Sequence, residues 1–462
     1  MGEKRRRNGS LITKGGLISA FSIGVALLLL IRQIPVTNLI GDEGMGYFAG
    51  AYQLYMVFVF LTAYSIPTAM GKMIALRVNR GQYKNAGQVF KAGFYFCLIL
   101  GVVIGILLLL FSGVLIEQLL KLPLSKLAFL CFIPTLLVVL VSGAFLGFFQ
   151  GMGSMMPTSV SKLVSAVIQF VMCLVIGYMV LSYGEKVAVV LNENSYASAF
   201  GATGISLGIL IGEIFALVFL VLLYMAYNKS FKNQVIRDTT KNTESITEII
   251  SMLLVSLLPF MVGALMLHGN VIVNQIIYNH TMVAKEQLAL ATEFGIYYGK
   301  YHILTGIPIA LLTVMAGNFS NVYGKLIARE NYYHAKRFFS DGLKEILIVS
   351  GVSAVILILF AGPFIEIFYK GDSVTAIKMM RIGSVAVVFY GLALLTKAAL
   401  WGHGKIWISN ITIIIGLVIS ALLLKILLIT TDLGILAVVI ANIVFPLIIF
   451  TENILILRKC QE

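Results

Sequence analysis

The chain has 462 residues, of which 59% are hydrophobic and 12% are charged, whereas a typical soluble domain has about 25% charged residues. This composition excludes an ordinary water-soluble fold, because so much apolar surface cannot be hidden in a soluble core. The formal net charge of +14 does not indicate nucleic-acid binding, since Lys and Arg of membrane proteins collect in cytoplasmic loops beside anionic lipid.

Apolar stretches recur along the whole chain with short polar breaks between them. A membrane-spanning helix needs about 20 mainly apolar residues, and grouping the stretches on that basis predicts about twelve spanning helices. The predicted spans are 14–40, 47–75, 87–113, 127–151, 158–183, 200–227, 247–278, 289–318, 341–368, 376–402, 406–430 and 433–457. We therefore expect an all-α integral membrane protein.

Loop charges predict the orientation of these spans. One set of alternate loops is rich in basic residues, and the other set is mixed or acidic. The basic set includes Lys4–Arg7, Arg77, Arg80, Lys84, Lys229, Lys232, Arg237, Lys325, Arg329, Lys405 and Arg458. The other set includes the acidic residues Asp42, Glu43, Glu117, Glu185, Glu193, Glu286, Glu366, Asp372 and Asp432, together with Lys121, Lys186, Lys285 and Lys370. The positive-inside rule then places both termini in the cytoplasm, in a bacterial cytoplasmic membrane.

Similar segments recur in the two halves of the chain, in the same order. The recurring positions are Pro67 and Pro308, Tyr83 and Tyr332, Gly113 and Gly362, and Gly151 and Gly402, at offsets of 241, 249, 249 and 251 residues. Six helices per half is an even number, so the halves would be parallel repeats around a central cavity, as in transporters that work by alternating access. We predict an N-terminal lobe at 1–227, a cytoplasmic linker at 228–246 and a C-terminal lobe at 247–462.

The sequence gives little support to catalysis. It contains no Walker-type phosphate loop, no HExxH motif and no CxxC pair, so we expect neither an enzyme nor a metal site. Without a nucleotide site, transport would draw on a coupling ion such as H⁺ or Na⁺, or on the membrane potential, and we predict no cofactor.

Ionisable and polar residues inside the predicted spans are the candidates for a binding site. A charge at mid-bilayer costs about 2.5–3.5 kcal/mol on insertion scales, so such residues usually face a cavity or a partner. Basic candidates for binding an anionic group are Arg32, Lys300 and Lys397, and candidates for polar cavity contacts or ion coupling are Glu293, His302, His268, Asn270, Asn274 and Glu213. Because basic residues outnumber acidic ones at depth, an anionic substrate such as a diphosphate is favoured over an organic cation.

Structural explanations remain open for several of these residues. Lys397 could extend its amine to the membrane surface, and Arg32 could lie near the interface. Glu213 and the polar face of the seventh span could form hydrogen bonds between helices alone. Pro67 and Pro308 break their helices at matching places, either as static kinks or as hinges or gates of the cavity.

Several motifs resemble the flippases of the multidrug/oligosaccharidyl-lipid/polysaccharide (MOP) exporter superfamily, most closely the stage V sporulation protein B and lipid II flippase-like branch. The resemblance rests on the segments 34–46, 65–72, 80–83, 149–161, 295–300 and 306–308. It implies two six-helix lobes around a cationic cavity that carries an undecaprenyl-diphosphate-linked sugar to the outer leaflet. It also implies basic cavity residues near the positions of Arg32 and Lys300.

These observations lead to three functional hypotheses. The first is a flippase for a polyprenyl-diphosphate-linked saccharide used in peptidoglycan, capsule or spore cortex, whose partners are that substrate, membrane lipids and possible envelope-synthesis enzymes. The second is an ion-coupled exporter of drugs or organic cations. The third is a membrane scaffold for envelope-synthesis enzymes.

Overall fold

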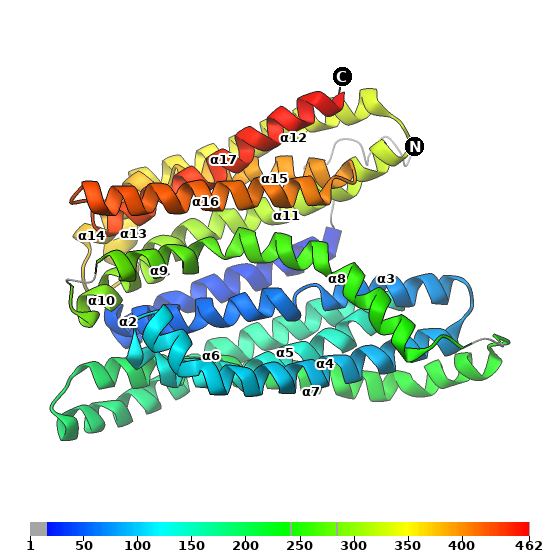
Figure 1. Ribbon diagram of the computed structural model, residues 1–462, viewed down its shortest axis with the longest axis horizontal. Coiled ribbons are helices and arrows are strands. Elements are labelled where there is room, and N and C mark those ends of the chain that lie inside the picture. Colours follow the sequence, from blue (N-terminus) through cyan, green and yellow to red (C-terminus); the bar gives the residue numbers. More distant parts are fainter. Residues whose placement is uncertain (1–15, 241–242, 283–284, 462) are drawn as a thin grey trace. The chain divides into compact units, whose positions relative to one another are not determined.

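The structure is a computed structural model that describes residues 16–240, 243–282 and 285–461. The basic cluster at 4–7 and the first residues of the predicted first span lie outside the described residues. Within the described residues the chain is almost entirely helical and has no β-strand, as the composition predicted (Figure 1).

Ten helical stretches of the described chain are long and apolar enough to cross a membrane, and the bent pair Val374–Gly383 and Ala386–Gly402 makes an eleventh when it is counted as one span. One of the ten, Ile23–Asn79, has 57 residues. A straight helix of that length would measure roughly 85 Å, nearly three times the ~30 Å apolar core of a bilayer. Gly41 interrupts this stretch with backbone angles of φ 73° and ψ 176°. Division at Gly41 gives twelve spans in the described chain, in agreement with the sequence.

Contacts divide the described chain into two compact units. Unit 1 contains residues 16–49 and 269–461, and unit 2 contains residues 50–268. These units are defined by contacts within one conformation. The predicted lobes 1–227 and 247–462 are instead defined by the sequence repeat, and the duplication stays a prediction. The chain passes between the units at Ala49–Gly50, inside α2 (Gly16–Thr62), and at His268–Gly269, between α8 (Ile246–His268) and α9 (Asn270–Thr281).

Unit 2 is built from the second part of α2 and six further helices. The further helices are α3 (Ile66–Asn79), α4 (Tyr83–Gly113), α5 (Lys126–Gly151), α6 (Met156–Leu191), α7 (Ser195–Arg237) and α8, with a π turn at Val114–Leu119 and a 3₁₀ turn at Pro123–Ser125. Helices α6 and α7 pack closely (Figure 1). Gly204, Gly208 and Gly212 form the contact face of α7, and a Cβ at Gly208 would lie 2.6 Å from the Cα of Cys173. Such small-residue stripes let membrane helices approach backbone to backbone.

Unit 1 contains the first part of α2 and ten further helices or turns. They are α9, α10 (Gln287–Ile296), the π turn η4 (Tyr297–His302), α11 (Ile303–Ala328), α12 (Tyr332–Leu359), α13 (Ala361–Phe368), α14 (Val374–Gly383), α15 (Ala386–Gly402), α16 (Ile406–Thr430) and α17 (Ile435–Gln461). Helix α15 packs against both α11 and α17, and α16 and α17 pack against α9. The core of this unit therefore carries the eighth, tenth and twelfth predicted spans.

The first part of the predicted linker at 228–246 is helical. Helix α7 continues to Arg237, because Phe231 is buried and packs edge-on against Phe148 with ring centroids 5.2 Å apart. The non-helical part therefore begins at Asp238, and its residues 241–242 lie outside the described chain. Burial disfavours the Asp238 carboxylate, but hydrogen bonds from the Lys84 and Thr240 N–H groups and the Thr240 hydroxyl outweigh it and hold the pKa of Asp238 below its ordinary value.

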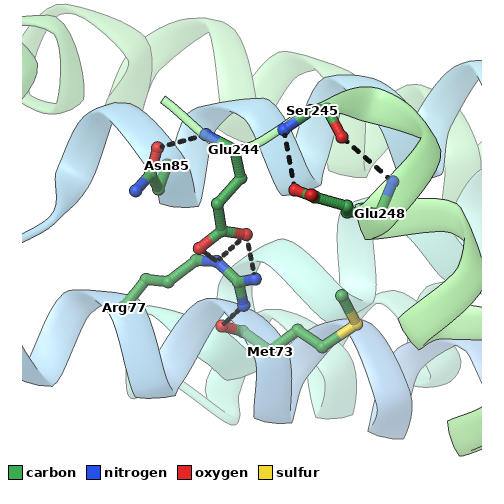
Figure 2. Close-up of polar contacts among 6 residues, drawn as sticks. All are labelled: Met73, Arg77, Asn85, Glu244, Ser245 and Glu248. Atoms are coloured by element: carbon green, nitrogen blue, oxygen red, sulfur yellow. Dashed lines mark hydrogen bonds and ion pairs between the residues drawn. The ribbon is translucent and has the colours of Figure 1, made fainter. Parts of the chain in front are cut away.

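The contacts of Glu244 with Arg77 and Asn85, here called the linker clasp, hold the other end of the linker, where α8 begins (Figure 2). The Arg77 guanidinium pairs with both oxygens of the Glu244 carboxylate, with its Nε 3.0 Å from each, and its Nη1 donates to the Met73 carbonyl at 2.7 Å. The Glu244 N–H donates to Asn85 Oδ1 at 3.2 Å. Ser245 and Glu248 form a reciprocal capping box at 3.3 Å, which satisfies N–H groups at the helix start. The linker is thus fastened to α3 and α4.

Candidate functional site

Lys300 is the most deeply buried charged residue of the described chain, with a side chain that is 0% exposed. It lies in the π turn η4, a type of helix irregularity that is frequent at functional sites. Its Nζ donates to Asp42 Oδ2 at 2.9 Å and to the Asp372 carbonyl oxygen at 3.0 Å. A buried ammonium needs such compensation, and in this conformation Asp42 supplies the counter-charge.

Close backbone packing brings Asp42 to this position. Asp42 follows Gly41, where α2 is interrupted. A Cβ at Gly295 would lie 1.7 Å from the Asp42 carbonyl oxygen, and a Cβ at Gly46 would lie 1.9 Å from the carbonyl oxygen of Ala291. No side chain fits at either glycine, so the α2 residues just after Gly41 lie directly on α10. The contact on α10 is at Gly295, five residues before Lys300.

The loop between α13 and α14, residues 369–373, closes the site from the other side. Asn38 of α2 holds it with two hydrogen bonds, from its Nδ2 to the Phe368 carbonyl at 2.7 Å and from the Lys370 N–H to its Oδ1 at 2.9 Å. Gly371 has a φ of 83° and faces the ion pair. Burial alone would raise the pKa of Asp372, but hydrogen bonds from Thr375 and Val374 and the charge of Lys300 hold it below its ordinary value.

Arg32 lies on the α2 segment that runs beside the eighth span. It is 5% exposed, and its Nη2 donates to Gln33 Oε1 at 3.1 Å. The neighbouring Thr37 is 3.5 Å from the Gly299 carbonyl oxygen, next to Lys300. The structure therefore places two of the three predicted anion-binding residues on a pair of packed segments in unit 1.

A buried polar cluster surrounds α9. Asn442 of α17 is its centre: its Oδ1 accepts from Tyr390 at 2.9 Å and from Asn270 at 3.3 Å, and its Nδ2 donates to the Tyr301 hydroxyl at 3.2 Å. Asn274 is 0% exposed, and within the described residues neither end of its amide has a hydrogen-bond partner. Because a buried unsatisfied polar group costs about 1–3 kcal/mol, Asn274 is suited to contact a polar ligand or water.

The other candidates of unit 1 have partners within that unit. Glu293 pairs with Lys285 Nζ at 2.6 Å and accepts a short hydrogen bond from Tyr278. His302 stacks on Tyr298, with ring centroids 5.4 Å apart. Lys397 is half-buried, and its Nζ lies 4.9 Å from the centre of the Trp401 ring, a cation–π contact within α15.

Glu213 and His268 lie in unit 2. Glu213 Oε1 accepts from Ser165 Oγ and from Gln169 Nε2, both at 2.8 Å, which ties α7 to α6. His268 is exposed and stacks on Phe60 with ring centroids 4.6 Å apart. These contacts are the interhelical hydrogen bonding and packing that sequence reasoning left open for the two residues.

The two candidate hinge prolines occupy different settings. Pro67 is the second residue of α3, just after the break between α2 and α3 at residues 63–65. Pro308 lies inside α11, and the helix continues through it from Ile303 to Ala328. The irregular part of the eighth span is instead η4, which ends six residues earlier. A hinge or gate role stays a prediction for both.

Sequence reasoning missed the partners of the buried residues. Asp42 and Asp372 were read only as loop charges, although a lysine predicted at full membrane depth requires a carboxylate or carbonyl partner. Asn270 and Asn274 are candidates because they are polar residues within an apolar run. The same signal could have identified Asn38 and Asn442.

The chain matches one family model and is similar to several known proteins. A family model described as polysaccharide biosynthesis protein matches residues 11–317. The chain is 23% identical over 446 residues to the lipid II flippase MurJ of Bacillus subtilis (strain 168), covering 92% of the chain and 77% of that protein. It is 22% identical over 388 residues to stage V sporulation protein B of the same organism, covering 82% and 70%.

A solved structure has the same fold. It is described as the inward-facing conformation of a multidrug resistance MATE family transporter of the MOP superfamily. It superposes with a TM-score of 0.76 at 18% sequence identity, covering 94% of this chain and 95% of the other.

Proposed function

The chain belongs to the polysaccharide biosynthesis protein family, in the lipid II flippase-like branch of the MOP superfamily, and we propose that it is a flippase for a polyprenyl-diphosphate-linked saccharide. The proposal places the cargo's movement in the bacterial cytoplasmic membrane, with both termini in the cytoplasm and alternating access as the mechanism. The precursor would serve peptidoglycan, capsule or spore cortex.

The observation that carries this proposal is the buried basic pair on α2 and η4. Arg32 and Lys300 are 5% and 0% exposed in a chain whose spans are mainly apolar. Burying cations in a membrane is costly, so their presence requires a reason. A diphosphate is an anion that Arg and Lys bind well, Arg through its planar donor fork and Lys as a point charge.

The remaining candidates have supporting roles in this proposal. The unsatisfied amide of Asn274 and its neighbour Asn270 would hydrogen-bond hydroxyl groups of the saccharide. Lys397 would be a further contact for the diphosphate, although its cation–π contact with Trp401 also explains its position. The polyprenyl chain would remain in the surrounding lipid. The energy would come from H⁺, Na⁺ or the membrane potential.

The experiment that tests this proposal asks which molecule the chain moves. In a depletion strain, a lipid-linked saccharide precursor is expected to accumulate on the cytoplasmic side. Arg32→Ala and Lys300→Ala variants that insert normally are expected to fail in complementation. Full complementation by both variants would refute the assignment of the binding site.

An exporter of organic cations is the alternative within the same superfamily. It would use acidic residues such as Glu213, whose carboxylate is held by Ser165 and Gln169. This alternative predicts raised drug susceptibility on depletion with normal levels of envelope precursors. Intact function after substitution of every buried basic residue would instead favour a scaffold.

A further inference from the structure

The ion pair between Lys300 and Asp42 occupies the place that an anionic cargo would need. The ammonium group of Lys300 has three donors, of which two bind Asp42 Oδ2 and the Asp372 carbonyl oxygen. A Cβ at Gly371 would lie 2.8 Å from Asp42 Oδ2 and 3.5 Å from Lys300 Nζ. A phosphate group is far larger than one carbon atom, so it cannot reach Lys300 while Asp42 and the 369–373 loop are in place.

The charge of Asp42, like the lack of space, opposes binding of a phosphate to Lys300 while Asp42 is in place. Asp42 carries the charge sign of a phosphate and is only 11% exposed. Its second oxygen, Oδ1, is buried and has no hydrogen-bond partner within the described residues. The Asp42 carboxylate is held by the Lys300 ammonium group and by a backbone hydrogen bond from Asp372, but its Oδ1 is unsatisfied, so its burial is incompletely compensated. Leaving this place for water would therefore cost Asp42 less than leaving a fully hydrogen-bonded site.

We infer that Asp42 is the resident counter-ion of Lys300, and that the diphosphate of the cargo replaces it and thereby loosens the 369–373 loop. This inference rests on the proposed function, because it names how that cargo gains access to Lys300. The loop would loosen because one of its anchors is the hydrogen bond from Lys300 to the Asp372 carbonyl. Asn38 would still hold the start of the loop, at Phe368 and Lys370.

Such an exchange keeps Lys300 paired in both states of the carrier. Leaving one buried charge without its partner is strongly destabilising. With Asp42 bound, the empty protein can change conformation without an unpaired ammonium in the membrane. With the diphosphate bound, the cargo supplies the counter-charge instead.

Binding of farnesyl diphosphate to the purified full-length protein in nanodiscs tests the exchange. Asp42→Asn removes the competing charge and is expected to bind this probe at least about tenfold more tightly than the wild type, a usual size for coupled equilibria. Lys300→Gln is expected to bind at least about tenfold more weakly. The double variant is expected to match Lys300→Gln. The matched control is Glu117→Gln, which neutralises the carboxylate of the exposed Glu117–Lys126 pair and is expected to bind like the wild type.

The outcomes separate this inference from the proposed function. If Lys300→Gln loses binding while Asp42→Asn binds no better than the wild type, the exchange is refuted and the proposed function stands. If none of the proteins binds farnesyl diphosphate, both are refuted.

Hydrogen exchange of the wild-type protein gives a second test that needs no variant. Farnesyl diphosphate is expected to speed amide exchange in residues 369–375, including the Lys370 N–H that Asn38 now accepts. Farnesol lacks the diphosphate and is expected to have no effect there. Unchanged or slower exchange with the diphosphate would overturn the inference.

Discussion

Arg77→Ala tests how firmly the linker clasp holds the start of α8 to α3 (Figure 2). The Arg77 side chain is 9% exposed and that of Glu244 is 28% exposed, so the pair is neither buried nor a surface pair. Exposed pairs contribute about 0–1 kcal/mol, and breaking a buried pair costs about 3–5 kcal/mol. Bidentate geometry and the bond to the Met73 carbonyl place this pair between those limits. We expect Arg77→Ala to reduce the free energy of unfolding by about 2 kcal/mol.

A double-mutant cycle with Glu244→Ala isolates the pair from the lost packing of the arginine stem. Reversible unfolding of the protein in mixed detergent micelles, followed by circular dichroism, supplies the four free energies of unfolding. We expect the double variant to lose clearly less stability than the sum of the single losses, with a coupling energy of about 1.5–2 kcal/mol. Additive losses would show that Arg77 and Glu244 do not act together and would refute this reasoning.

Two further predictions concern unit 2. Gly208→Leu would drive a side chain into the backbone of Cys173, so it is expected to lower the free energy of unfolding by at least about 1–3 kcal/mol or to abolish folding. The control is Gly351→Ala, because a Cβ at Gly351 meets no atom within 4 Å. Equal melting temperatures for the two variants would contradict the close packing of α6 and α7. The folded-state pKa of Asp238 is lowered, so its contribution to stability is present above its unfolded pKa of about 3.9 and is lost as the pH falls through the folded value. The protection of the Lys84 amide, measured as its exchange rate relative to the intrinsic rate at the same pH, is therefore expected to fall at acid pH, because this N–H donates to Asp238, and Asp238→Asn is expected to remove this pH dependence.

Much of the fold could be predicted because the spans follow from local composition. Twelve apolar stretches separated by polar breaks are enough to place the helices. The interruption at Gly41 agrees with the predicted end of the first span at residue 40. Helix α7 continues past the predicted end of the sixth span near residue 227, because burial of Phe231 extends it into a polar segment. Tertiary packing of one side chain decided that boundary, and hydropathy does not report it.

The candidate site could be predicted only in part, for a different physical reason. The depth of Lys300 in its span is a local property, so the sequence indicated a buried cation. Its partner Asp42 lies 258 residues away in the chain. That pairing depends on the register between α2 and α10, which the contacts of Gly46 and Gly295 fix. The π turn at 297–302 likewise leaves no pattern in hydrophobic spacing.

Transport by the purified protein is the most direct test of the proposed function. The protein is reconstituted into liposomes that carry a fluorescent polyprenyl-diphosphate-linked saccharide, and a membrane-impermeant quencher reports how fast the label changes leaflet. We predict rapid movement with the wild type and with Glu117→Gln, and movement at least about tenfold slower with Lys300→Gln, as expected when a transition-state or binding contact is lost. Movement no faster with the wild type than in protein-free liposomes would contradict the account.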